Sequence, residues 1–489
     1  MNSSTEFGLP GAVPPAGRKQ NILINAGWLT VSRLSLDLVN LVLFVVLSRR
    51  FGPAGIGQYA YGFSVAMILA AVVNLGFEDY AIRECARHGR DERGPLIGRL
   101  LGTQCLAGGT VAVILIALFA ATQTPIAGVL ATLLLVVSQV FVTSARTLYA
   151  PAFAEREMVV PAMMELGSRA GSIVVAILLV SGLKTDLWVG LVPLPIGAMI
   201  FLSASYRSSR QYIGNFRVNI GIDVAREAIR QSWPFAVSIF VFYFYARIDV
   251  IMLALMRSEA DAGIYATALK VLEVGVRPLG FVAIAAFPLL SKRFMSAEDA
   301  FRRTAVRLVG VATLAGGVLG WGMFFVAPLG IVPLLGQWFS VATVAVKEVA
   351  LLGVLMSVNV TVFRILFARN LQVKVVKAQA IATVLNVILN FWLIPILGIP
   401  GAILASIISQ IFMIGLYFVM IDDRELGRHL IGIIGLSIAS LAAGAATGAV
   451  AGAIGLSSWL IAGTSLLVLV GGMGVVYLRV EKVLAAAAA

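Results

Sequence analysis

The chain has 489 residues, of which 60% are hydrophobic and only 12% charged, and its formal net charge is +13. Soluble chains carry about 25% charged residues, so this composition excludes a soluble globule and indicates an all-α polytopic membrane protein. Two cysteines, Cys85 and Cys105, are too few for a disulfide framework or a thiolate metal site, so we expect no metal site and no cofactor.

Apolar stretches of roughly 20 residues can cross a bilayer as helices, and about 14 such stretches are predicted here. A polar tail at 1–21, without the apolar core of a signal peptide, precedes them. The N-terminal lobe, 22–206, is predicted to contain helices at 22–48, 55–80, 96–121, 125–150, 159–182 and 187–206. After a linker at 207–230, the C-terminal lobe, 231–421, is predicted to contain helices at 231–256, 262–290, 304–327, 341–366, 373–396 and 399–421.

The end of the chain adds two predicted helices that belong to neither lobe. A loop at 422–429 leads into 430–479, which contains apolar stretches at 430–453 and 457–479, and a tail at 480–489 follows. Between 328 and 340 the apolar pattern is interrupted by Pro328, Gly330 and Pro333. That interruption predicts a short re-entrant or surface segment.

Lysine and arginine are distributed unevenly between the two predicted faces of the membrane. If the N-terminus is cytoplasmic, about 26 of the 37 basic residues fall on the cytoplasmic side and about four on the outer side. Because cytoplasmic loops are enriched in basic residues, we expect both termini and the 207–230 linker to be cytoplasmic. This topology explains the net charge, and no nucleic acid partner is expected.

Two segments 206 positions apart repeat the same order of features. Gly57-Gln58-Tyr59-Ala60 follows the first predicted helix, and Gly263-Ile264-Tyr265-Ala266 follows the seventh. Each opens a long helix that passes a glycine and ends in a basic loop. The repeat predicts two six-helix lobes related by an axis along the membrane normal, which in transporters bind substrate between them and alternate access by rocking.

Longer motifs occur in a definite order in both lobes. The N-terminal lobe carries Phe51-Gly52-Pro53-Ala54-Gly55-Ile56-Gly57-Gln58-Tyr59-Ala60, Asn74-Leu75-Gly76-Phe77 and Ile82-Arg83-Glu84. The C-terminal lobe carries Arg247-Ile248-Asp249, Phe287-Pro288-Leu289-Leu290-Ser291 and Asn386-Val387-Ile388-Leu389-Asn390. Together these motifs resemble the polysaccharide exporters of the multidrug/oligosaccharidyl-lipid/polysaccharide (MOP) transporter superfamily.

The resemblance implies a flippase in the bacterial cytoplasmic (inner) membrane, with its lobes in a V-shaped, MATE-like arrangement around a cationic cavity. Its implied cargo is an undecaprenyl-diphosphate-linked oligosaccharide for surface or exopolysaccharide biosynthesis. Membrane lipids, a polysaccharide polymerase and chain-length machinery are the implied partners. Lipid II flippases of this superfamily carry an S-R-x-x-G-x-x-R-D-like pattern in their first helix. Here Ser32-Arg33 is followed by neither the glycine nor the second arginine, which argues against lipid II.

Basic side chains deep in the predicted helices are the candidates for substrate binding. A cation at the centre of a membrane helix costs about 2.5–3.5 kcal/mol on insertion scales. Such residues are retained when they face a water-filled cavity, a ligand or an acidic partner, and a guanidinium suits a diphosphate because it binds phosphate bidentately. Arg146 and Lys347 are expected to reach an interface. We therefore predict that one inter-lobe cavity is lined by Arg33, Arg169, Arg247, Lys270 and Arg277.

Four acids in the same helices are candidates for coupling transport to H⁺ or Na⁺: Asp37, Glu165, Asp249 and Glu273. Asp37 is the first candidate, because it lies deepest in its predicted span. Asp37 lies four residues after Arg33, and Glu165 lies four before Arg169, so each pair shares one helix face. Arg247 and Asp249 are two apart and are expected to meet different partners. Ion pairing that only joins helices is the alternative to a role in transport for each of these residues.

Two other functional classes compete with the flippase. A cation-coupled multidrug exporter of the same fold would be expected to have a cavity dominated by acids and aromatic residues, whereas basic residues outnumber deep acids here. A membrane enzyme that polymerises or ligates polysaccharide would be expected to carry a large outer loop with catalytic residues. The predicted outer loops are short and contain no nucleophile–base pattern, so an enzyme is not expected.

Overall fold

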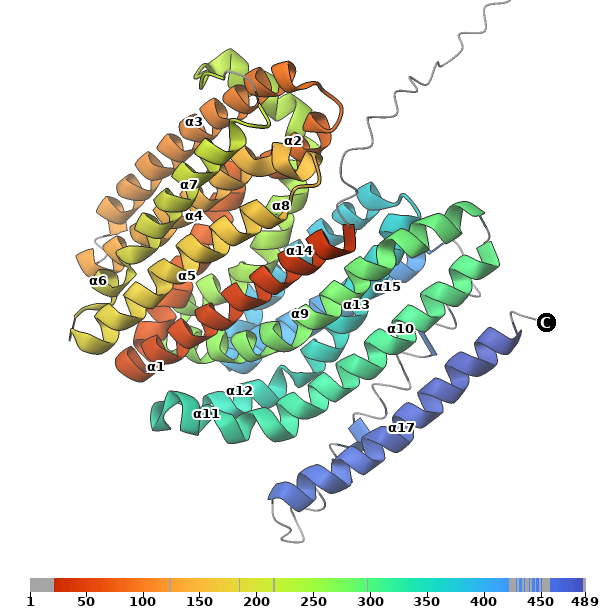
Figure 1. Cartoon of the computed structure of the whole chain (residues 1–489). Coiled ribbons are helices and arrows are strands. Elements are labelled where there is room, and N and C mark those ends of the chain that lie inside the picture. Colours follow the sequence, from red (N-terminus) through yellow and green to blue (C-terminus); the bar gives the residue numbers. More distant parts are fainter. Residues whose placement is uncertain are drawn as a thin grey trace, which may run out of the picture.

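The computed structural model describes residues 22–421 except 123–124, 184, 214–215 and 297, together with scattered positions between 428 and 450 and residues 458–486. Within these residues the fold is all-helical, as predicted. Figure 1 shows two groups of helices, α2–α7 on one side and α9–α15 on the other, with α1 crossing the front of the bundle between them.

The first half of the chain begins with α1 (Ile22–Asn74), which contains the first predicted span and most of the second. The predicted loop between them is a single kink at Gly52, whose φ of 65° is accessible to glycine and is followed by Pro53 at the start of the next helical turn. The remaining helices are α2 (Phe77–Cys85), α3 (Arg90–Thr122), α4 (Ile126–Ala154), α5 (Val159–Gly182), α6 (Leu187–Leu191) and α7 (Pro193–Ser209).

The second half begins earlier than the hydropathy pattern predicts. Helix α8 starts at Ile222. The hydropathy pattern misses its first turns because they carry charged residues, which lower the hydropathy without breaking the helix. The predicted 207–230 linker is therefore helical at both ends. The remaining helices are α9 (Glu259–Ser296), α10 (Glu298–Trp321), a π-helical turn (Gly322–Val326), α11 (Ala327–Leu335), a 3₁₀ turn (Gln337–Phe339), α12 (Ala342–Glu348), α13 (Ala350–Ala368), α14 (Gln372–Leu397), α15 (Ile399–Met420) and α17 (Ser458–Ala486).

The predicted interruption at 328–340 is mostly helical. Pro328 stands in the first turn of α11, where proline is tolerated. Arg49 of α1 donates hydrogen bonds to the carbonyl oxygens of Pro333 and Leu334, at 2.7 and 2.6 Å. These bonds satisfy carbonyls at the C-terminal end of α11 that have no partner within the helix.

Membrane-spanning length is common among the described helices. Ten helical runs are long and apolar enough to cross a bilayer, and the first of them contains the Gly52 kink. Helices α9 and α17, of 38 and 29 residues, are also of spanning length. All predicted spans thus correspond to helical residues except 430–453, most of which lies outside the described residues. Helix α17 packs along α10 at the edge of the bundle (Figure 1).

The two repeated segments touch each other at equivalent positions. A Cβ built on Gly57 would lie 1.7 Å from the carbonyl oxygen of Glu259, and one built on Gly263 would lie 2.0 Å from that of Pro53. Pro53 and Glu259 are separated by the same 206 positions as the two glycines. A two-fold axis between the halves would produce this reciprocity. The lobe boundaries themselves stay a prediction.

Candidate functional site

Charged side chains within the bundle gather in two clusters. The first, which we term the α8–α9 cluster, comprises Arg247 of α8, three residues of α9 and Asp37 of α1. The α9 residues are Lys270, Glu273 and Arg277. The second, the α4–α5 cluster, comprises Arg146, Glu165 and Arg169.

Glu273 is the common acceptor of the α8–α9 cluster. Its carboxylate lies 3.0 Å from Nη2 of Arg247, 3.7 Å from Nζ of Lys270 and 3.7 Å from Nη2 of Arg277. The three α9 residues meet because positions 270, 273 and 277 share one helix face. The cluster has three cations and two acids, so it retains one positive charge.

Asp37 pairs across the molecule and not along its own helix. Its carboxylate contacts Nη1 of Arg277, so the ion pair joins the first half of α1 to α9. The shared helix face of Arg33 and Asp37 had suggested a local pair, and the structure shows no such contact. Helix α1 packs extensively against α9, and this tertiary contact brings the guanidinium of Arg277 to the carboxylate of Asp37. The Arg277 side chain remains 42% exposed and is therefore accessible to a ligand.

Glu165 organises the α4–α5 cluster. It accepts hydrogen bonds from Nη2 of Arg146 at 2.8 Å and Nη1 of Arg169 at 3.1 Å. The expected pairing of Glu165 with Arg169 is present. Arg146, by contrast, was expected to reach an interface and instead lies inside the bundle. A neighbouring acid on another helix stabilises it there, and no spacing in the sequence signals that contact.

Tyr59 connects the surroundings of the two clusters. It lies close enough to Arg169, Arg247 and Glu273 for their charges to act on its hydroxyl. The ring of Phe63, one turn further along α1, stacks on Tyr59, and its face lies 5.4 Å from the guanidinium carbon of Arg247. The second half of α1 therefore runs between the two groups of charges.

The five predicted cations are thus divided. Arg247, Lys270 and Arg277 come together in one cluster, and Arg169 belongs to the other. Arg33 is exposed on α1 and forms no ion pair with any residue that the structure describes. Lys347 is also exposed, with its Nζ 5.8 Å from the ring of Phe324.

Asp249 is buried among neutral donors. It accepts hydrogen bonds from the Tyr265 hydroxyl at 2.9 Å, from Nδ2 of Asn390 at 2.6 Å and from the Ser406 hydroxyl. Asn390 also donates to Oδ1 of Asn386 at 3.0 Å. In the described part of the chain no basic side chain forms an ion pair with Asp249. Arg247 and Asp249 therefore meet different partners, as the sequence predicted.

Comparison with known proteins gives this arrangement a context. A family model described as polysaccharide biosynthesis protein matches residues 22–294, more than half of the chain. Among curated protein sequences, none matches. Solved structures with a similar fold include the lipid II flippase MurJ in an inward closed conformation. That match has a TM-score of 0.69 at 14% identity and covers 92% of this chain and 98% of that chain.

Two transporters share the fold at lower scores. An inward-facing multidrug resistance MATE family transporter gives a TM-score of 0.61 at 13% identity, with 83% of this chain and 98% of that chain covered. A MOP superfamily transporter from Pyrococcus furiosus gives 0.57 at 15% identity, with 85% and 96% covered. With its apolar helices and this fold, the chain is a multi-pass membrane protein, and it belongs to the polysaccharide biosynthesis protein family.

Proposed function

We propose that the protein is a flippase for an undecaprenyl-diphosphate-linked oligosaccharide in the bacterial cytoplasmic membrane. It moves the lipid-linked repeat unit from the inner to the outer leaflet for surface or exopolysaccharide biosynthesis. Both termini and the linker lie in the cytoplasm, and a polysaccharide polymerase with its chain-length machinery receives the product. Family membership and the fold support a transporter of this class.

The observation that carries this proposal is the excess of cations in the α8–α9 cluster. Three basic side chains share two acids, and one of the cations, Arg277, is exposed beside an acid from the other half of the molecule. A diphosphate offers several acceptor oxygens to such a group. A cationic drug would instead be repelled by the remaining positive charge.

The cross-molecule ion pair suggests how binding is linked to movement. A phosphate oxygen that approaches Arg277 competes with Asp37 for the same guanidinium. Binding would weaken the ion pair between α1 and α9, so the cargo itself would loosen one of the contacts between the two halves. A ligand shifts a conformational equilibrium only through such differential contacts.

Asp249 is the proposed coupling carboxylate among the four acids. Asp37, Glu165 and Glu273 each contact at least one arginine, and the positive charge of the arginine balances the negative charge of the carboxylate. Asp249 has hydroxyl and amide neighbours instead, and their oxygens together with the carboxylate suit H⁺ or Na⁺. Cation binding there would neutralise a buried charge.

A reconstituted flipping assay tests the proposal. Proteoliposomes would contain an undecaprenyl-diphosphate oligosaccharide with a fluorescent sugar, and an impermeant quencher would report which leaflet the label occupies. We expect wild-type protein to equilibrate the label and Arg277→Gln to abolish flipping while it still inserts. Lys347→Gln removes a membrane cation outside the clusters and should retain activity. No flipping by correctly inserted wild-type protein would overturn the proposed cargo.

Lipid II is the second candidate, because the MurJ fold covers most of the chain. Lipid II shares the undecaprenyl-diphosphate and differs in its sugar–peptide headgroup. Lipid II and the oligosaccharide lipid can therefore compete in the same assay. Preferential flipping of lipid II would assign the protein to cell-wall synthesis.

A further inference from the structure

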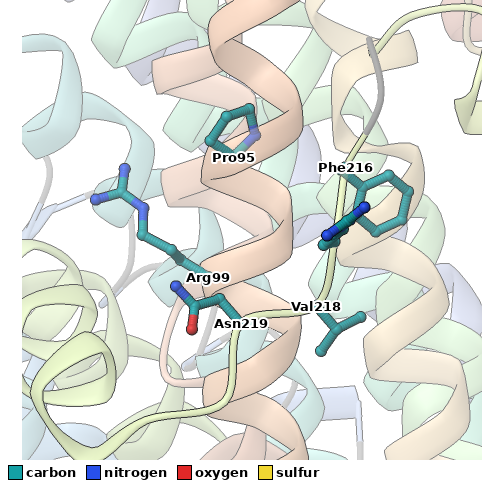
Figure 2. Close-up of a pocket in the computed structure, with 6 residues that line it drawn as sticks. Pro95, Arg99, Phe216, Val218 and Asn219 are labelled. Atoms are coloured by element: carbon teal, nitrogen blue, oxygen red, sulfur yellow. The ribbon is translucent and has the colours of Figure 1, made fainter.

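The segment at 216–220, which joins α7 to α8, is extended and lies along α3 (Figure 2). Its backbone packs against two glycines of that helix. A Cβ on Gly98 would lie 2.2 Å from the carbonyl oxygen of Arg217, and one on Gly102 would lie 1.9 Å from that of Asn219. The backbone N–H of Asn219 also donates a hydrogen bond to the carbonyl oxygen of Gly98, with an N–O distance of 3.1 Å. Backbone contact therefore fixes the position of the segment on α3.

A cavity of about 470 Å³ lies between this segment and α3, and it is lined by Pro95, Arg99, Phe216, Arg217, Val218 and Asn219. Figure 2 shows Arg99 and Asn219 on one side of the segment and Phe216 and Val218 on the other. The lining contains two arginines and no acid. Neither arginine forms an ion pair with a residue that the structure describes. The cavity is thus positively charged and partly apolar.

The surroundings of the cavity match the edge of a membrane. Most of the apolar stretch of α3 faces outward, with Val113 68% exposed. Arg99 lies in the N-terminal part of α3, at the start of the predicted span 96–121, where we expect lipid headgroups to meet acyl chains. On the segment, Val218 and Ile220 are 48% and 60% exposed. Exposed apolar side chains beside arginines are typical of interfacial membrane contacts.

We infer that this cavity binds the phosphate of an anionic membrane lipid. Arg99 and Asn219 donate hydrogen bonds to the phosphate oxygens, and Arg217 adds charge attraction. Val218 and Ile220 contact the upper part of the acyl chains. The bound lipid fixes the rim of the first half, and the start of the connection to the second half, at the membrane surface. This site is separate from both charged clusters and does not depend on the identity of the cargo.

Lipid titration of the purified full-length protein tests the inference. Phosphatidylglycerol or phosphatidylcholine would be added to the protein in neutral detergent, and bound lipid would be counted by native mass spectrometry. We expect wild-type protein to prefer phosphatidylglycerol. The Arg99→Gln/Arg217→Gln variant should bind it about 30-fold more weakly, since each arginine near an anionic surface contributes about 1 kcal/mol. Arg207→Gln/Arg226→Gln removes the same charge near the same linker, outside the cavity, and should retain the preference.

Two further variants distinguish a specific lipid-binding site from non-specific electrostatic attraction to the protein surface. Gly98→Ala would displace the segment and should weaken phosphatidylglycerol binding although both arginines remain. Gly109→Ala, on α3 with open space around its Cβ, is the control. Equal losses in the two arginine double variants would show general surface charge and overturn the site. Displacement of the lipid by millimolar inorganic phosphate would show a free-anion site and also overturn the inference.

Discussion

Replacing Glu273 by glutamine tests whether the α8–α9 cluster is held by charge balance. The substitution keeps the shape of the side chain and removes the negative charge that Arg247, Lys270 and Arg277 share. Asp37 would then face three cations alone. Removing one partner of a buried ion pair costs about 3–5 kcal/mol. Because a quarter of the Glu273 side chain is exposed, we expect a loss at the lower limit, about 3 kcal/mol.

Thermal unfolding in detergent measures this loss. A destabilisation of about 3 kcal/mol should lower Tm by about 3 °C in a chain of this size. Adding Lys270→Gln returns the net charge of the cluster from +2 to its original +1, so the double variant should recover a large part of the loss. Asp261→Asn is the control, because Asp261 belongs to an exposed pair with Arg257 at 3.8 Å and should change Tm little. An unchanged Tm in Glu273→Gln, or a further decrease in the double variant, would refute the charge-balance argument.

Four other expectations concern the ion pair on α1, the buried Asp249, the contact between the repeats and the topology. Asp37→Asn should leave Arg277 free of its partner on α1 and raise the affinity for the diphosphate lipid while slowing its flipping, as measured by equilibrium binding and by the quenching assay. Asp249→Asn should remove the dependence of transport on an H⁺ or Na⁺ gradient but leave cargo binding intact; a retained gradient dependence would eliminate Asp249 as the coupling acid. Gly57→Val should hold the two repeats apart at their contact and abolish transport, whereas Gly27→Val, with open space at its Cβ, should remain active. Ser208→Cys in a cysteine-free background should resist impermeant thiol reagents in intact cells, and its labelling from outside would reverse the proposed topology.

The positions of the helices were predictable because hydrophobic length alone specifies a membrane span. The connections were less predictable, since they depend on a few backbone angles. Gly52 replaces an expected loop by one residue with positive φ, and α11 forms across prolines that hydropathy treats as a break.

In the candidate site, too, contacts within one helix could be predicted from the sequence, whereas contacts between helices could not. Residues on one helix face, such as Lys270, Glu273 and Arg277, could be grouped from their spacing. The pairing of Asp37 with Arg277 could not, because it depends on how α1 crosses α9. Arg146 was misplaced for the same reason, since its partner Glu165 comes from a different helix.

The contact between Gly57 and Gly263 also bears on how the chain arose. Each glycine approaches a carbonyl oxygen of the opposite repeat through its backbone, at positions related by one constant offset. If a half-length ancestor paired with a second copy of itself, the same contact would have formed between two identical glycines. A single mutation there would have altered both sides of that homodimer at once. In that case gene fusion would have ended the constraint, and each half could then have acquired its own charges while the shared backbone contact persisted.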